Sequence, residues 1–222
     1  ARRDGDHWVL NGTKQWITNG GYAGYNVVFA RTSDGNGAKG ISAFVVPKDS
    51  PGLRIGPEEH KMGLKSSNTV QLLLEDCRIP LDCLLGREGQ GFEVAMAGLD
   101  GGRLGIAAQA LGLGRAAMQA GVAYAKERKA FGKPISDLGA IQDFLANTSM
   151  ELDAARLLIW RGATALDRGE RVTREASMAK VFSTEAAGRA ADRMLQVHGG
   201  YGYVTDFPIE RIYRDVRVTR IY

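Results

Sequence analysis

The sequence predicts a multi-domain chain of mixed α and β class, with a β-rich part followed by an antiparallel helical bundle. Two observations support this. Short β-prone runs alternate with turn residues before Pro80, and apolar residues recur at helical spacings after it. With 222 residues, the chain can hold one large domain or two modest ones. We therefore expect a β sandwich or barrel over residues 1–80 and a helical-bundle domain over residues 81–222.

The β-rich part contains several candidate strands. His7–Leu10, Asn11-Gly12 and Thr13–Thr18 together predict a hairpin, because Asn-Gly supplies the positive φ values of a type I′ turn. Further strands, separated by loops that contain Gly, Asp or Pro, are expected at Tyr25–Arg31, Ile41–Val46 and Val70–Cys77.

The helical part contains three long periodic segments. The first covers about Arg103–Arg128, the second starts near Ile141, and the third carries apolar residues from Ala179 to Val197. Phe131–Pro134 and Asp167–Gly169 break the chain between them. We expect the first helix in the middle of the bundle or at a subunit contact, because its small residues let helices approach closely. These are Gly105, Ala107, Ala108, Ala110, Gly112 and Gly114.

Composition excludes several classes of function. The net charge of +4 is spread along the chain without a basic stripe, so we expect no nucleic-acid binding. No stretch approaches the ~18 consecutive apolar residues that a membrane helix needs. Cys77 and Cys83 predict reduced thiols rather than a disulfide framework. The histidines His7, His60 and His198 lack the spacing of metal ligands, so no metal site is expected.

Two segments of the helical part suggest a phosphate-bearing ligand. Gly199-Gly200-Tyr201-Gly202 ends a long helix. A glycine C-cap explains one glycine, and the others suggest close approach of the backbone to a ligand. Arg128–Lys133 groups three cations around Phe131, which suits either a diphosphate clamp with an aromatic platform or compensation of a helix dipole. Gly112-Leu113-Gly114 lacks the third glycine of a dinucleotide fingerprint and is expected to serve packing.

Two further segments leave a ligand role open. Asp100 and Arg103 place a carboxylate and a guanidinium three residues apart at an expected helix start, where Asp100 could also be an N-cap. Trp16 and Thr18 place an aromatic ring and a hydroxyl on the same face of a strand, before a glycine-rich loop. Alone, the strand segment is more typical of core and turn than of a binding site.

Six separated blocks resemble the acyl-CoA dehydrogenase family in both order and spacing, and the resemblance is closest to its short-chain and branched-chain members. The blocks extend along the full chain: Trp16–Gly21, Glu75–Pro80, Gly89–Phe92, Leu99–Arg103, Glu127–Lys133 and Gln196–Gly202.

This resemblance implies an FAD enzyme that oxidises an acyl-CoA to its trans-2-enoyl form. A glutamate takes the α-proton, a hydride leaves to the flavin, and electrons pass to an electron-transfer flavoprotein. The implied fold has an N-terminal helical domain, a middle β domain and a C-terminal four-helix domain. It is assembled as a homo-oligomer, a dimer of dimers. The implied location is the bacterial cytoplasm or the mitochondrial matrix.

The resemblance also implies roles for particular residues. Trp16, Ile17 and Thr18 are expected beside the flavin ring. Residues at the diphosphate and adenosine end, reached from a neighbouring subunit, are expected to be Arg128, Phe131, Gln196, Val197, His198, Gly199 and Gly200. Residues near the acyl-CoA are expected to be Asp100, Arg103 and Tyr222.

The same resemblance implies a partial chain that lacks the N-terminal domain and the extreme C-terminus. The catalytic glutamate is expected directly after Tyr222, and the alternative position of the base aligns with Gly102, which cannot take a proton. No catalytic residue is therefore expected within the chain. Gly139 occupies a position where many relatives carry a glutamine that contacts FAD. Two alternatives stay open, an acyl-CoA oxidase and a non-catalytic helical scaffold.

Overall fold

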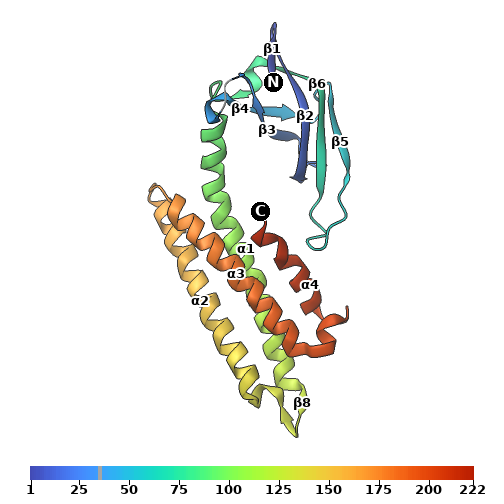
Figure 1. Ribbon diagram of the computed structural model, residues 1–222, viewed down its shortest axis with the longest axis vertical. Helices are drawn as coiled ribbons and strands as arrows, with labels where there is room; N and C mark the ends of the chain where they lie inside the picture. The colour runs from blue at the N-terminus through green and yellow to red at the C-terminus, as the bar shows by residue number, and fades with distance from the viewer. Residues whose placement is uncertain (35–36) are drawn as a thin grey trace. The chain divides into compact units, whose positions relative to one another are not determined.

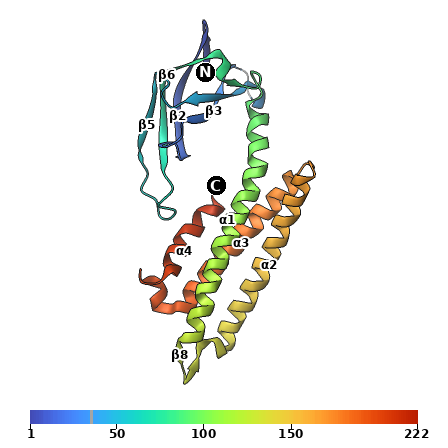
Figure 2. The same ribbon diagram turned by 180° about the vertical axis from the view of Figure 1, so that it is seen from behind.

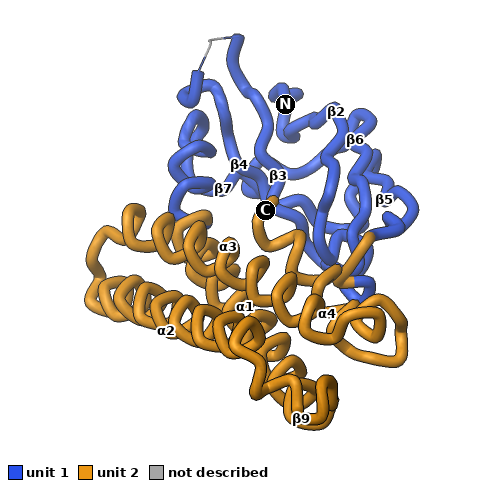
Figure 3. The backbone as a smooth tube through the Cα atoms, turned by 60° about the horizontal axis from the view of Figure 1, so that its bottom comes forward, with its two compact units in different colours: residues 1–61, 65–98 blue, residues 62–64, 99–222 orange. Residues whose placement is uncertain are grey.

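The computed structural model describes residues 1–34 and 37–222, which form two compact units (Figure 3). The first unit comprises residues 1–61 and 65–98, and the second comprises residues 62–64 and 99–222. The predicted fold class, β-rich and then helical, is confirmed. The domain boundary at residue 80 stays a prediction, since the division between the compact units falls inside helix α1 (Gly91–Glu127).

The first unit is a β sandwich. Its larger antiparallel sheet has the order β1-β2-β6-β5 (Figure 1), and its smaller sheet has the order β3-β4-β7 (Figure 3). Leu10 and Ile79 of the larger sheet share one buried core with Phe44 and Val46 of the smaller sheet. The strands are β1 (Arg2–Asp4), β2 (His7–Thr18), β3 (Tyr25–Arg31), β4 (Ile41–Pro47), β5 (Leu53–Glu58), β6 (Thr69–Pro80) and β7 (Leu84–Leu85).

The hairpin predicted at Asn11-Gly12 is wrong, because β2 runs through both residues as one strand. Leu10 pairs with Cys77 and Gly12 pairs with Leu74, so β6 carries the extra residue of a β-bulge opposite Asn11. The Asn11 side chain donates to Asp76 Oδ1 at 3.0 Å and accepts from the Asp76 backbone N–H at 2.8 Å. Positive φ values occur on both strands here, 47° at Asp76 and 137° at Gly12. The chain instead reverses at Gly5, whose φ is 61°, between β1 and β2.

Strand β5 was not expected, since it contains Gly56 and Pro57. The sheet order places β5 at an edge, where a proline needs no ladder hydrogen bond. Its position in the sheet therefore explains how a sequence with weak strand propensity forms a strand.

The second unit contains the helical bundle. Helices α2 and α3 lie side by side in both views (Figures 1 and 2). The helices are α1, α2 (Gly139–Asp167), α3 (Thr173–His198) and α4 (Pro208–Val216), with short 3-10 turns η1 (Ala38–Gly40), η2 (Leu81–Cys83), η3 (Ile135–Asp137), η4 (Gly199–Tyr203) and η5 (Arg217–Arg220). No helix among the residues described is both long and apolar enough to span a membrane.

Helix α1 starts at Gly91, well before the expected start near Arg103. Its small residues explain part of the packing. A Cβ at Gly114 would lie 2.7 Å from Leu152 Cδ2 and 3.3 Å from the Ala187 Cα, so α1 approaches α2 and α3 closely here. A Cβ at Gly112 would meet no atom within 4 Å, so the glycine is not needed there for close packing. The close helix approach expected from the small residues is confirmed at Gly114 and is wrong at Gly112 within this chain, and a subunit contact of α1 stays a prediction.

The break at Phe131–Pro134 is a small β-hairpin between β8 (Lys129–Ala130) and β9 (Lys133–Pro134). Phe131 and Gly132 form the turn with φ values of 54° and 79°. Positive φ at both central residues is what a type I′ turn requires. The hairpin thus ends α1 and presents Arg128 at the junction.

Candidate functional site

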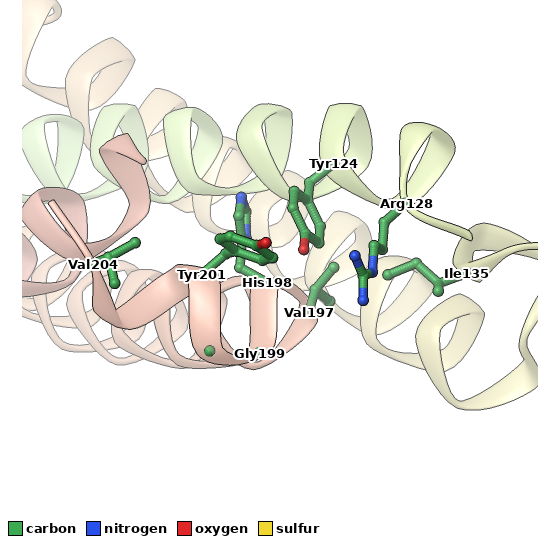
Figure 4. A pocket seen from close by; sticks show the side chains of 9 residues that line it. Tyr124, Arg128, Ile135, Val197, His198, Gly199, Tyr201 and Val204 are labelled. Carbon is green, nitrogen blue, oxygen red and sulfur yellow. The ribbon is translucent and has the colours of Figure 1, made fainter. Parts of the chain in front are cut away.

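A pocket of about 460 Å³ lies in the second unit where α3 ends (Figure 4). It is formed by the last turns of α1 and α3 together with η3 and η4. The lining residues are Tyr124, Arg128, Ile135, Val197, His198, Gly199, Gly200, Tyr201 and Val204.

One wall of the pocket is aromatic. The Tyr124 ring stacks on His198 with centroids 4.3 Å apart and an interplanar angle of 24°. Phe207 packs edge-on to Tyr124 at 5.7 Å. His198 is only 3% exposed, and its Nδ1 lies 2.7 Å from the Met194 carbonyl oxygen. Since a carbonyl only accepts, Nδ1–H is the donor. His198 is therefore fixed as part of the wall.

Arg128 supplies the positive charge of the pocket. Its guanidinium carbon lies 5.9 Å from the Tyr201 ring centroid, within the range of a cation–π interaction. Across the described residues, no carboxylate pairs with Arg128. An exposed guanidinium held over a ring and free of acidic partners is suited to bind an anion.

The glycines at the end of α3 expose backbone to the pocket. Gly199 has φ 57° and ψ −134°, a backbone conformation that residues other than glycine rarely adopt. A Cβ at Gly199 or Gly200 would meet no atom within 4 Å, so nothing in the chain occupies that space. Gly202 differs, because a Cβ there would lie 2.6 Å from the Leu195 carbonyl oxygen. Two of the glycines thus leave open space, and the third is required by packing.

These groups fit the diphosphate end of FAD chemically. A free guanidinium, accessible glycine backbone and neighbouring aromatic rings provide charge, close approach and a flat contact surface. The pocket contains five of the residues expected at this end of the cofactor, which come from the ends of α1 and α3: Arg128, Val197, His198, Gly199 and Gly200.

Two residues expected with them lie elsewhere. Phe131 is 91% exposed at the hairpin tip and does not line the pocket. Gln196 lines a separate groove of about 520 Å³ along α3, α4 and η5. Tyr124 was not predicted from the sequence, although it lies four residues before Arg128. Arg128 directly follows α1, and its backbone N–H donates to the Tyr124 carbonyl at 2.9 Å, a spacing that brings the two side chains together.

The segment expected at the flavin ring lies in the first unit, at the end of β2. Trp16 is 67% exposed, Thr18 is exposed and Ile17 is half-buried. Trp16 has φ 61°, and the pairing with β6 shifts between Lys14 and Ile17. The bulge interrupts the alternation from which a shared face for Trp16 and Thr18 was expected. Their flavin contact stays a prediction.

Asp100 and Arg103 are engaged within the bundle. Arg103 Nη1 donates to Asp100 Oδ1 at 3.0 Å, and the Thr173 hydroxyl donates to Asp100 Oδ2 at 2.6 Å. Asp100 thereby links α1 to the first residue of α3. The alternative that Asp100 is an N-cap is wrong, because α1 begins at Gly91. Contact of either residue with acyl-CoA stays a prediction.

We expect the Thr173→Val substitution to lower the free energy of unfolding by about 0.5–1.5 kcal/mol, the net value of one hydrogen bond to Asp100. Thermal unfolding of the full-length protein would measure it. Ser177→Ala is the control, since the exposed Ser177 hydroxyl donates only to the Thr173 carbonyl within the same helix, at 2.7 Å. Equal Tm values for Thr173→Val and the unsubstituted protein would contradict the linking role of Asp100.

Tyr222 lies against α1. Its hydroxyl donates to Gln109 Oε1 at 2.6 Å, and burial raises the pKa of Tyr222 above its ordinary value. The hydroxyl therefore stays protonated at neutral pH and keeps its donor role. A contact between Tyr222 and substrate is not tested by this geometry.

The chain matches two family models. Residues 1–77 match the acyl-CoA dehydrogenase middle domain, and residues 89–222 match the acyl-CoA dehydrogenase C-terminal domain. Together the two matches cover most of both compact units.

Curated relatives and solved structures agree with these models. The chain is 50% identical over 222 residues to the mitochondrial short-chain specific acyl-CoA dehydrogenase of Mus musculus, covering 100% of this chain and 54% of the relative. Butyryl-CoA dehydrogenase from Megasphaera elsdenii aligns with a TM-score of 0.97 and 41% identity, covering 100% of this chain and 58% of that one. A chain from a study of the electron transferring flavoprotein of Acidaminococcus fermentans aligns with a TM-score of 0.97, 45% identity and the same coverages of 100% and 58%. The chain spans about half the length of the curated relatives that it matches.

Proposed function

The chain belongs to the acyl-CoA dehydrogenase family, and from this membership we propose that it is part of an FAD-dependent dehydrogenase acting on a short- or branched-chain acyl-CoA. The product is the trans-2-enoyl-CoA. Similarity to a short-chain specific enzyme and to a butyryl-CoA dehydrogenase supports the short-chain assignment.

The observation that carries the proposal is the pocket between Arg128 and Gly199-Gly200. Arg128 offsets the negative charge of a diphosphate, and the glycines let that group approach the backbone. The stacked Tyr124 and His198 rings give the pocket a rigid wall. When bound, FAD supplies the hydride acceptor. We propose that Thr18 donates a hydrogen bond to the flavin ring and that Trp16 covers it.

We propose that a glutamate directly after Tyr222 takes the α-proton. The preceding segment is anchored in ways that support this role. Arg220 Nε donates to Glu185 at 2.8 Å, and the Thr219 hydroxyl is buried and donates to the Val216 carbonyl at 2.8 Å. With Tyr222 held on Gln109, a residue attached to this segment has a restricted position, which general base catalysis requires. Gly102 offers no side chain for the same task.

The remaining assignments follow from the same proposal. We propose an electron-transfer flavoprotein as the electron acceptor and a homo-oligomer, a dimer of dimers, as the assembly. The compartment is the bacterial cytoplasm or the mitochondrial matrix. Large apolar side chains on α2 and α3 support a subunit contact, since Leu157 is 63%, Trp160 60% and Val181 58% exposed.

The test uses the full-length flavoprotein under anaerobic conditions. We expect butyryl-CoA or isobutyryl-CoA to bleach the flavin absorbance, because the substrate reduces the cofactor. Absence of bleaching with any acyl-CoA up to medium chain length would contradict the proposal. Peroxide formation during turnover without an electron-transfer flavoprotein would identify an oxidase instead. Failure of the full-length protein to bind FAD would favour the non-catalytic scaffold.

A further inference from the structure

Gln71, the third residue of β6, lies opposite a bulge on each neighbouring strand. On β2, Lys14 pairs with Leu72 and Ile17 pairs with Val70, so β2 carries one extra residue opposite Gln71. On β5, Ile55 pairs with Leu72 and Glu58 pairs with Val70, which gives the same excess. Both bulges therefore lie in the row of Gln71, and bulges commonly re-aim a side chain.

Two side-chain hydrogen bonds form a chain that connects Gln71 to Gln15 and Gln15 to Glu59. Gln71 Nε2 donates to Gln15 Oε1, and Gln15 Nε2 donates to Glu59 Oε1 at 2.7 Å. The Glu59 carboxylate offers acceptor oxygens, so the amide nitrogen of Gln15 faces it. The oxygen of Gln15 then faces Gln71, which must donate. The three groups therefore have one consistent direction of donation.

The hydrogen-bonded Gln15 lies next to a residue with a strained backbone, Trp16. Trp16 follows Gln15 directly and has φ 61°, a conformation that costs a bulky side chain free energy unless its surroundings enforce it. The other end of the segment is also held. The Asn19 N–H donates to the Asn68 carbonyl at 2.8 Å, and the Gly21 N–H donates to Asn68 Oδ1 at 2.9 Å. The segment between these anchors is thus fixed while the Trp16 side chain stays 67% exposed.

We propose that Gln15, Glu59 and Gln71 are positioning residues that set the Trp16–Thr18 segment against the flavin. The inference rests on the proposed function, because that function makes Trp16–Thr18 the flavin contact. The three side chains act through the backbone of the bulge: the hydrogen bonds hold Gln15, and Gln15 holds the peptide that carries Trp16. They do not need to touch the cofactor.

The direction of donation makes a sharp test possible in the full-length flavoprotein. Q71E places carboxylates on both sides of Gln15, whose amide group can face only one of them, so the chain is broken. E59Q leaves an acceptor oxygen for Gln15 and keeps the chain. The double variant Q71E/E59Q restores both hydrogen bonds in the opposite direction. Once the Gln15 amide turns over, the new glutamine at position 59 donates to the Gln15 oxygen, and the Gln15 nitrogen donates to the new glutamate at position 71. Q119E, on the exposed surface of α1, is the control for added charge.

Two readouts report on the segment. Hydrogen exchange of the peptide covering residues 14–19 is expected to accelerate about five- to ten-fold in Q71E, as loss of about one net hydrogen bond predicts. The visible circular dichroism of bound flavin is expected to shift in Q71E. Both signals should return to the unsubstituted values in Q71E/E59Q and should stay unchanged in E59Q and Q119E.

Different outcomes overturn different statements. If Q71E and Q71E/E59Q behave alike, or if Q71E changes the exchange rate but leaves the flavin signal unaltered, the positioning role is overturned. If the unsubstituted full-length protein binds no flavin, the proposed function fails and the inference fails with it. A protein that binds flavin normally but is insensitive to Q71E rejects the inference alone.

Discussion

Replacing Arg128 with alanine is expected to weaken FAD binding about 10- to 100-fold. The reason is that a charge-assisted hydrogen bond contributes about 1.5–3 kcal/mol, and within the described chain no acidic side chain occupies the Arg128 guanidinium. The measurement is a titration of the full-length apoprotein with FAD, followed by calorimetry or by quenching of flavin fluorescence. Arg128→Lys is expected to retain part of the affinity, because it keeps the charge but not the fork of donors.

Lys129→Ala is the matched control for this prediction. Lys129 is the next cation along the chain and is also exposed, but it lies in β8 and does not line the pocket. The Lys129→Ala substitution is expected to change the affinity for FAD by less than about three-fold, because salt at physiological ionic strength screens a distant exposed charge. Equal losses in Arg128→Ala and Lys129→Ala would show that the general charge of this segment, not the pocket, attracts the cofactor.

Replacing Gly63 with alanine is expected to lower the free energy of unfolding by about 1–3 kcal/mol, because there is no room for the added methyl group. A Cβ at Gly63 would lie 2.5 Å from the Arg214 carbonyl oxygen and 2.8 Å from the Asp215 Cα. These atoms belong to the backbone of α4, which cannot rotate away as a side chain can. Thermal unfolding should show the loss as a Tm lower by about 2–4 °C per kcal/mol in a chain of this size.

The surroundings of Gly63 make relaxation costly. Arg214 Nη1 donates to the Met62 carbonyl at 2.8 Å, and the Leu64 N–H donates to Asp215 Oδ1 at 2.6 Å. Arg214 Nε also donates to Glu210 Oε2 at 2.8 Å, and this hydrogen bond to the Glu210 carboxylate raises the pKa of the guanidinium. Moving the loop away from α4 would therefore stretch two hydrogen bonds as well as relieve the clash.

Gly139→Ala is the control for Gly63→Ala. A Cβ at Gly139, the first residue of α2, would meet no atom within 4 Å. Alanine has a higher helix propensity than glycine, so the free energy of unfolding of this variant is expected to be unchanged or higher by up to about 1 kcal/mol. A Gly63→Ala protein as stable as Gly139→Ala would contradict the close approach of residues 62–64 to α4.

Sequence patterns predicted strands and helices correctly where strand propensity or helical periodicity alone dominated a segment. The β-prone run Tyr25–Arg31 predicted β3 with its observed bounds, and the periodicity after Ile141 predicted α2. Prediction failed where one signal suits two structures. Asn11-Gly12 favours a turn but lies inside β2, opposite a bulge of β6, and the turn with two positive φ values is formed by Phe131-Gly132.

The sequence by itself determined the order of β and helical parts and the residue types of the candidate pocket. Arg128 and Gly199-Gly200 were identified from their chemistry, and the family resemblance supplied their expected ligand. Both kinds of information are carried by short stretches of chain, since periodicity, turn propensity and charge act between neighbouring residues.

Only the tertiary structure decided which distant segments meet. It brought Arg128 and Gly199 to one pocket, linked Asp100 to Thr173, and packed Gly63 against α4. It also showed that Gln71 lies opposite two bulges. The physical reason is that these contacts depend on strand register and helix packing, which are set by the burial of the whole core and not by the residues at the contact itself.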